Sequence, residues 1–160
     1  MIYIVIFIFV WLCWKGFKLQ VRDAVRDVHS MVKDNRSKET AISNWQNVVN
    51  KLGLDLSNMP IVYMKVSKGK ETLYVPQYIW RQGDYLGLFM DNPNKWLPLG
   101  EGWQALTYEE NLKPNYLSIS SIRNIYRLNN LCHMDFKNDS PILFSIDSFS
   151  VFQSLCPELI

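Results

Sequence analysis

The sequence predicts an α+β protein with an N-terminal membrane anchor and two helices, then a small antiparallel sheet or partly open barrel with a C-terminal helix. Three observations carry this prediction. The first fourteen residues are uncharged, residues 17–52 place apolar side chains at helical spacing, and residues 61–146 alternate short strand-like runs with turn residues. We divide the chain into a membrane anchor (1–18), an amphipathic stalk helix (19–36) and a cytoplasmic α+β domain (37–160).

The N-terminal apolar run is short for a membrane span. Fourteen helical residues rise roughly 21 Å, whereas a hydrocarbon core is about 30 Å thick. Flanking lysines can snorkel to the interface, and tryptophan is typical of the headgroup level. We assign membrane anchoring to Ile2, Ile4, Ile6, Phe7, Ile8, Phe9, Trp11, Trp14, Lys15 and Lys18.

Three other interpretations of this run stay open. A buried β-strand is compatible with its Ile, Val, Phe and Tyr content, and the protein would then be a soluble domain. A cleaved signal peptide would need a basic segment before the apolar run and small residues at the cleavage site, and the sequence has neither. A helix lying in the membrane plane would need a polar face, which residues 2–14 lack.

Charge predicts the orientation of the anchor. Seven basic and three acidic residues lie between Lys15 and Lys38, and no basic side chain precedes the run. The positive-inside rule therefore places the N-terminus outside and the C-terminal domain in the cytoplasm of a single-pass protein.

Composition limits the partners. The formal net charge is only +2, and most of the excess lies beside the anchor, which argues against nucleic-acid binding and for contact with membrane lipid. Cys132 and Cys156 have no spacing typical of a disulfide framework or a zinc site, so we expect free thiols in a reducing compartment.

The segment after the anchor has the pattern of an amphipathic helix. Its apolar stripe is Val21, Val25, Val28 and Val32, at spacings of four, three and four. Such a stripe packs either on the protein's own domain or, since the spacing suits a coiled-coil seam, on a protein partner or a second copy of the chain. The run is too short to choose between them.

A turn and a second helix are expected next. Residues 34–40 (DNRSKET) break the apolar pattern, and Ser37 is placed as an N-cap. The second helix runs from Lys38 to Leu52, and Gly53 ends it as a left-handed residue. Its apolar face comprises Ile42, Trp45, Val48, Val49 and Leu52.

From residue 61 the pattern changes to strands. Residues 61–66 and 72–78 predict a hairpin, with Pro76 indicating an edge or a bend. Residues 78–82 and 85–90 flank Gly83-Asp84, a dipeptide typical of a two-residue hairpin turn.

The C-terminal part continues this alternation. Residues 116–131 fit a strand or a helix, and we favour a strand. Residues 132–137 and 141–146 predict a further hairpin, and Ser148 is placed as the N-cap of a last helix.

No sequence motif supports catalysis or a cofactor. Gly69-Lys70 lacks the earlier glycine and the following Ser or Thr of a phosphate-binding loop. His133 and Asp135 would share one face of a strand, but two ligands are too few for zinc. Cys132 would point to the opposite face, so a Cys–His pair is not expected. We predict no metal site, no cofactor and no catalytic residue.

Aromatic side chains next to turns provide the candidate partner-binding residues: Trp80, Tyr85, Trp96 and Trp103. The sequence therefore favours a non-enzymatic, membrane-anchored binding or scaffold module that docks a protein partner at the cytoplasmic membrane surface. The alternative is a membrane-tethered enzyme that acts on a lipid or peptide through the face of His133 and Asp135.

Overall fold

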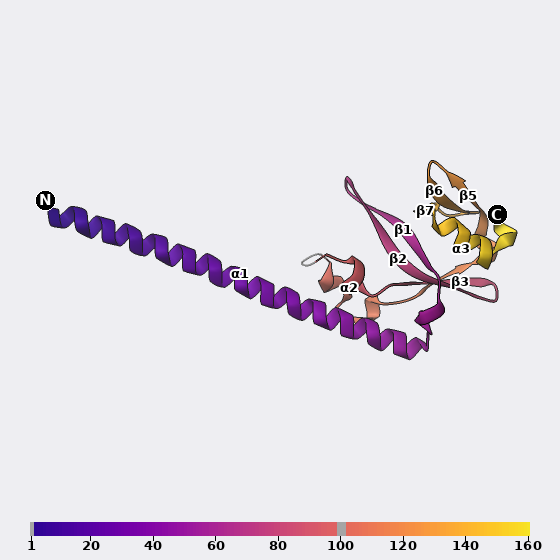
Figure 1. Ribbon diagram of the computed structural model, residues 1–160, viewed down its shortest axis with the longest axis horizontal. Helices are drawn as coiled ribbons and strands as arrows, with labels where there is room; N and C mark the ends of the chain where they lie inside the picture. The colour runs from indigo at the N-terminus through magenta and orange to yellow at the C-terminus, as the bar shows by residue number, and fades with distance from the viewer. Residues whose placement is uncertain (1, 99–101) are drawn as a thin grey trace.

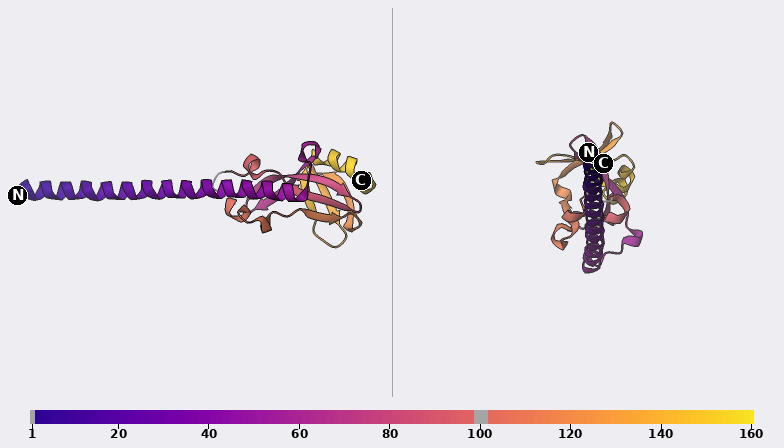
Figure 2. Two further views of the ribbon diagram at one scale, coloured as in Figure 1. Left: turned by 90° about the horizontal axis from the view of Figure 1, so that it is seen from below. Right: turned by 90° about the vertical axis from the view of Figure 1, so that its left-hand side faces the viewer.

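A long N-terminal helix packs its C-terminal part against an α+β domain and extends well beyond it (Figures 1 and 2). In this computed structural model the backbone is described for residues 2–98 and 102–160, and the side chains for residues 23–98 and 102–160. The helices are α1 (Ile2–Leu52), α2 (Pro93–Trp96) and α3 (Ser148–Leu155). The strands are β1 (Ile61–Lys68), β2 (Glu71–Gln82), β3 (Tyr85–Met90), β4 (Asn115–Ser118), β5 (Ile122–Leu128), β6 (Leu131–Phe136) and β7 (Ile142–Ser145).

α1 is one continuous helix, so the predicted turn over residues 34–40 and the predicted N-cap at Ser37 are wrong. The segment contains neither proline nor glycine, and the Thr40 hydroxyl donates a hydrogen bond (2.8 Å) to the Arg36 carbonyl within the helix. The predicted end of the helix is confirmed. Gly53 has φ 62°, and its N–H donates to the Asn50 carbonyl (3.2 Å).

The described strands form one open antiparallel sheet in the order β4-β3-β2-β1-β7-β6-β5. The predicted antiparallel sheet is therefore confirmed in its open form, and the barrel alternative is not. One residue pair, Met64 with Phe144, joins β1 to β7. The sheet thus consists of a four-stranded part (β4-β3-β2-β1) and a three-stranded part (β7-β6-β5) that meet at a narrow junction.

Two hydrophobic cores lie against the sheet. One joins Val62 and Ile79 to β5, β6, β7 and α3, with Phe144 and Phe152 in edge-to-face contact at 4.9 Å. The other packs the C-terminal part of α1 onto Tyr78 and Phe89 of the sheet. The strands β2 and β3 are therefore covered by α1 on one side and by the α3 layer on the other.

The hairpin turns follow from their residues. Gly69 and Gly83 have φ values of 63° and 58°, which glycine adopts without strain. Asn129 and Asn130 have φ values of 51° and 60° between paired Leu128 and Leu131. This is the pattern of a type I′ turn, and it settles residues 116–131 in favour of strands, with a short 3₁₀ turn at Ile119–Ser121 between β4 and β5.

Two local expectations need correction. Pro76 lies in β2, which is an interior strand of the sheet and not an edge. It pairs with Tyr63 of β1, and although β2 pairs with β3 only from Gln77 onward, the Pro76 carbonyl accepts a hydrogen bond from the Asp91 N–H (2.9 Å) just beyond β3. Ser148 is the first residue of α3 rather than its cap. Its hydroxyl accepts a hydrogen bond from the Tyr63 N–H (3.0 Å) and so ties α3 to β1.

Candidate functional site

The predicted anchor residues, Ile2 to Lys18, lie outside the described side chains, although their backbone continues α1. Among the helices of the described region, none is long and apolar enough to cross a membrane.

Trp103 and Trp80, two of the predicted partner-binding residues, pack within the domain itself. Trp103 is only 3% exposed, and its indole N–H donates to the Pro98 carbonyl (3.1 Å). Trp80 lies over Gly87 of the neighbouring strand and meets Tyr116 edge-on at 5.9 Å. It therefore covers three adjacent strands.

The other two candidates are more accessible. Tyr85 is 51% exposed at the start of β3. Trp96 is half-buried at the end of α2 and donates its indole N–H to the Asp91 carbonyl (3.0 Å). Trp80 and Trp103 belong to the same hydrophobic core beneath α1, whereas Tyr85 and Trp96 do not.

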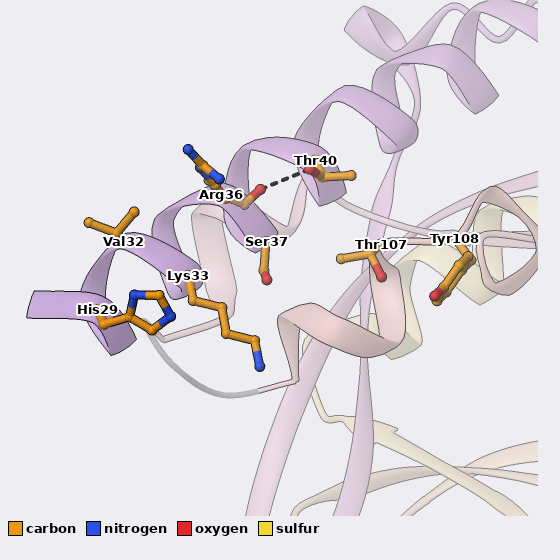
Figure 3. Close-up of a pocket in the computed structure, with 8 residues that line it drawn as sticks. All are labelled: His29, Val32, Lys33, Arg36, Ser37, Thr40, Thr107 and Tyr108. Atoms are coloured by element: carbon orange, nitrogen blue, oxygen red, sulfur yellow. Dashed lines mark hydrogen bonds between the residues drawn. The ribbon is translucent and has the colours of Figure 1, made fainter. Parts of the chain in front are cut away.

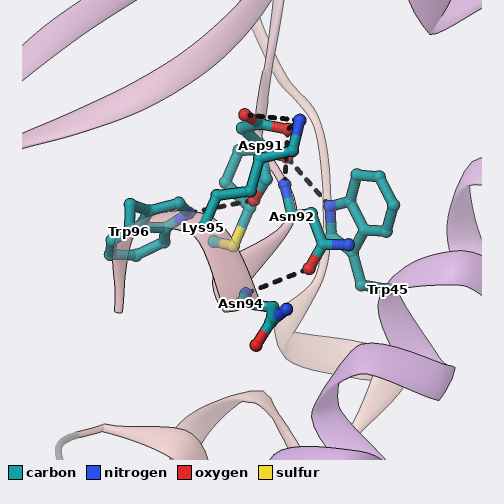
Figure 4. A network of polar contacts seen from close by, with 7 residues as sticks. Trp45, Asp91, Asn92, Asn94, Lys95 and Trp96 are labelled. Carbon is teal, nitrogen blue, oxygen red and sulfur yellow. Dashed lines mark hydrogen bonds and ion pairs between the residues drawn. The ribbon is translucent and has the colours of Figure 1, made fainter. Parts of the chain in front are cut away.

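A buried carboxylate organises the segment around Trp96 (Figure 4). Asp91 accepts a hydrogen bond from the Asn92 N–H (2.7 Å) and pairs with Lys95 at 3.3 Å. The Trp45 indole of α1 donates to the Met90 carbonyl at 3.0 Å. This network attaches α1 to the end of β3.

The face of His133 and Asp135 is geometrically as the sequence predicts. Cys132 is fully buried on the opposite side of β6, and burial raises the pKa of its thiol to about 11. The His133 ring stacks on Tyr126 at 5.1 Å, and the Tyr126 hydroxyl donates to Asp135 at 3.1 Å. Burial and the neighbouring Asp135 carboxylate raise the pKa of Tyr126.

The chemistry of this cluster is limited. The Nε2 atom of His133 is buried without a hydrogen-bond partner among the described residues. No group of three or more His, Cys, Asp or Glu side chains that could hold a metal occurs in the part of the chain that the structure describes. The cluster thus packs one face of the β5–β6 hairpin.

The most accessible apolar surface lies on α1. Val25, Val28 and Val32 are 62%, 60% and 47% exposed, and Met31 beside them is 66% exposed. At 100° per residue the three valines fall within an arc of roughly 60°. We call these four residues the valine face.

Val25, Val28 and Val32 do not pack against the core of the protein's own domain. α1 contacts the domain through Ala41, Trp45, Val48 and Val49, which are all buried. Helical geometry places this buried side roughly 150° from the valines. The interpretation in which the valine stripe packs on its own domain is therefore wrong for Val25 and Val28, whereas Val32 lies at the edge of a groove that α1 forms with Thr107 and Tyr108.

A basic row runs beside the valine face. Arg26, His29, Lys33 and Arg36 follow one another at spacings of three, four and three and are all exposed. This spacing places them on one side of the helix, next to the valines. We call them the basic ridge. The acidic residues Asp23, Asp27 and Asp34 fall on the other side of α1 by the same geometry.

A groove opens where the basic ridge reaches the domain (Figure 3). It encloses about 460 Å³ between α1 and the turn at Thr107 and Tyr108. Lining side chains from α1 are His29, Val32, Lys33, Arg36, Ser37 and Thr40. The groove thus combines cationic groups, hydroxyl groups and the exposed ring of Tyr108.

Three contacts with α1 hold the wall of the groove. Asn44 donates to the Thr107 carbonyl, and Lys51 forms an ion pair with Glu109, which also accepts a hydrogen bond from Asn47 (3.4 Å). The hydrogen bond from Lys51 lowers the pKa of Glu109. The wall is therefore fixed to the same helix that supplies the basic ridge.

The valine stripe could be predicted from the sequence, but the groove could not. The spacing of the basic residues was a readable signal, but Thr107 and Tyr108 join them only through folding. Comparisons of the chain with protein-family models, with curated proteins and with solved structures find no match. The class that the fold and the site define is an open-sheet α+β domain fixed to the end of a long helix.

Proposed function

We propose that this chain is a single-pass, membrane-anchored docking module, with residues 1–18 in the bilayer and the valine face of α1 binding a protein partner. One observation carries the proposal: apolar side chains at regular spacing stay exposed on the part of α1 that precedes its contacts with the domain core. An exposed apolar row of this kind is a common mark of a protein interaction site.

The continuity of α1 supports the link between anchor and domain. Because no turn interrupts Ile2–Leu52, the helix carries the uncharged run and the domain on one rod. Residues 18 to 41 span roughly 35 Å at 1.5 Å per residue. The helix thus serves as a spacer that presents the valine face between membrane and domain.

The charge distribution supports a cytoplasmic domain, since the basic residues follow the apolar run. Protease added outside intact cells should then leave the domain intact. Digestion before permeabilisation would contradict this orientation.

Anchoring is tested by the double substitution Ile6→Asp and Ile8→Asp. Each carboxylate costs about 2.5–3.5 kcal/mol at the centre of a membrane helix, so the variant should move to the soluble fraction. A wild-type protein that is soluble without detergent would refute the anchor.

Docking is tested by Val28→Asp in the full chain, purified from membranes in mild detergent. Because Val28 is 60% exposed, the melting temperature should stay within a degree or two, while proteins that co-purify with the wild type should be lost. Val66→Asp on the β1–β2 hairpin, also an exposed valine, is the matched control and should retain them. Equal recovery with both variants would refute docking at the valine face.

A further inference from the structure

We propose that the partner at the valine face is an amphipathic helix whose own apolar stripe is bordered by Asp and Glu side chains. This inference rests on the proposed docking function and specifies the chemistry of its partner. Its basis is that the valine face and the basic ridge run side by side on neighbouring sides of α1, over roughly three turns in all.

The first step is charge. The ion pairs within the described residues involve Lys51, Arg81 and Lys95, and none of them uses the basic ridge. An approaching helix that covers the valines would bring its flanking residues to the ridge, as e and g positions do in a coiled coil. Carboxylates at these flanks complement the ridge, whereas lysines would be repelled.

The second step is length and shape. From Val25 to Thr40 the surface runs roughly 22 Å, which matches a partner helix of about fifteen residues. The groove at Thr107 and Tyr108 receives the end of that helix. Its hydroxyl groups, including Ser37, can donate hydrogen bonds to carboxylates there.

The third step concerns a second copy of this chain as the occupant. In an antiparallel pair the two basic ridges would face each other. In a parallel pair the ridge would face the side of the other helix that carries Met31. Asp23, Asp27 and Asp34 lie away from the valine face, and Glu39, seven residues after Val32, would meet Glu39 of the other copy. Neither arrangement neutralises the ridge, so an acidic partner is favoured over self-pairing.

The fourth step concerns anionic lipid. Along α1, Arg26 lies roughly 12 Å and Arg36 roughly 27 Å beyond Lys18. The headgroup layer is about 5–7 Å thick on each side of the hydrocarbon core. A helix that leaves the membrane near its normal therefore carries most of the basic ridge past the headgroups, where a protein can reach it.

The test uses two fluorescent synthetic peptides of three heptads, with Val and Leu at the a and d positions. One carries Glu at e and g, and the other carries Lys there. Binding to the full-length protein in nanodiscs of neutral lipid is measured by fluorescence anisotropy. The Glu peptide should bind at least tenfold more tightly than the Lys peptide, and its affinity should fall as salt is raised.

Charge reversal of the ridge gives the decisive comparison. The triple variant Arg26→Glu, Lys33→Glu, Arg36→Glu should bind the Glu peptide about tenfold more weakly and should gain affinity for the Lys peptide. The control variant reverses Lys65, Lys68 and Lys70 on the β1–β2 hairpin, so it has the same net charge. It should bind both peptides as the wild type does.

Each other outcome overturns the inference in a recognisable way. Equal binding of both peptides that is abolished by Val28→Asp would support docking at the valine face but refute the acidic nature of the partner. Loss of Glu-peptide binding when anionic lipid is added to the nanodiscs would assign the ridge to lipid. Cross-linked dimers that exclude the peptide would assign the face to a second copy. A wild-type protein found in the soluble fraction would instead refute the anchoring in the proposed function.

Discussion

The substitution Lys38→Pro distinguishes a continuous helix α1 from two helices joined by a turn at residues 34–40. If a helix began after an N-cap at Ser37, residue 38 would be its first position, where proline is favoured. In the continuous α1, proline at 38 removes the N–H that bonds to the Asp34 carbonyl and clashes with that carbonyl. The expected cost is about 3 kcal/mol, which corresponds to roughly a 100-fold change in an opening equilibrium.

Hydrogen exchange measures this free-energy cost at the individual amides around residue 38. Amides of residues 34–37 and 39–41 should exchange roughly 100-fold faster in Lys38→Pro than in the wild type, because local opening becomes that much easier. The control is Lys38→Ala, which also removes the contact of the Lys38 ammonium with the Trp103 ring (5.7 Å) but keeps the backbone hydrogen bond. If Lys38→Pro and Lys38→Ala exchange alike, α1 is not continuous at this point.

Three further predictions concern the domain. Trp103→Ala should lower the free energy of unfolding by about 3–5 kcal/mol in chemical denaturation, because the ring is 3% exposed. Trp96→Ala should lower it clearly less, because Trp96 is half-buried. Gly87→Ala should cost about 1–3 kcal/mol in the same assay, since the added Cβ would lie 2.2 Å from the neighbouring indole. Burial raises the pKa values of the Cys132 and Cys156 thiols from near 9 to about 11, so the folded state retains protons that the unfolded state releases. Stability should therefore be unaffected by these thiols below pH 9 and fall between pH 9 and 11, and a thiol reagent at pH 8 should modify them only on unfolding.

Turn residues and alternating apolar side chains were enough to predict much of the sheet. Gly83 and the segments on either side of residues 138–140 place two hairpins correctly, because such local signals depend on a few backbone angles. The turn at Asn129-Asn130 carried the same kind of signal and was overlooked. The junction of Met64 with Phe144 could not be predicted, since it joins strands eighty residues apart.

The candidate site was predictable only in part. The valine stripe is visible as spacing, but its exposure depends on how far along α1 the domain reaches. The aromatic residues show the converse. Trp103 lies in a segment rich in glycine and proline, as surface loops are, yet it fills the core beneath α1. Local composition does not determine burial where a distant element covers a loop.

The error at residues 34–40 points to how α1 is organised. The apolar side of the helix lies at Val25, Val28 and Val32 before this segment and at Ala41 and Trp45 after it, on nearly opposite sides. A polar stretch between two apolar stripes has the same appearance as a turn, but here it is the place where the stripe changes side within one helix. Residues 23–33 are exposed on all sides of α1, because this part of the helix projects beyond the domain. One helix therefore holds its domain through its C-terminal part and presents a separate apolar surface on the part that projects (Figure 2).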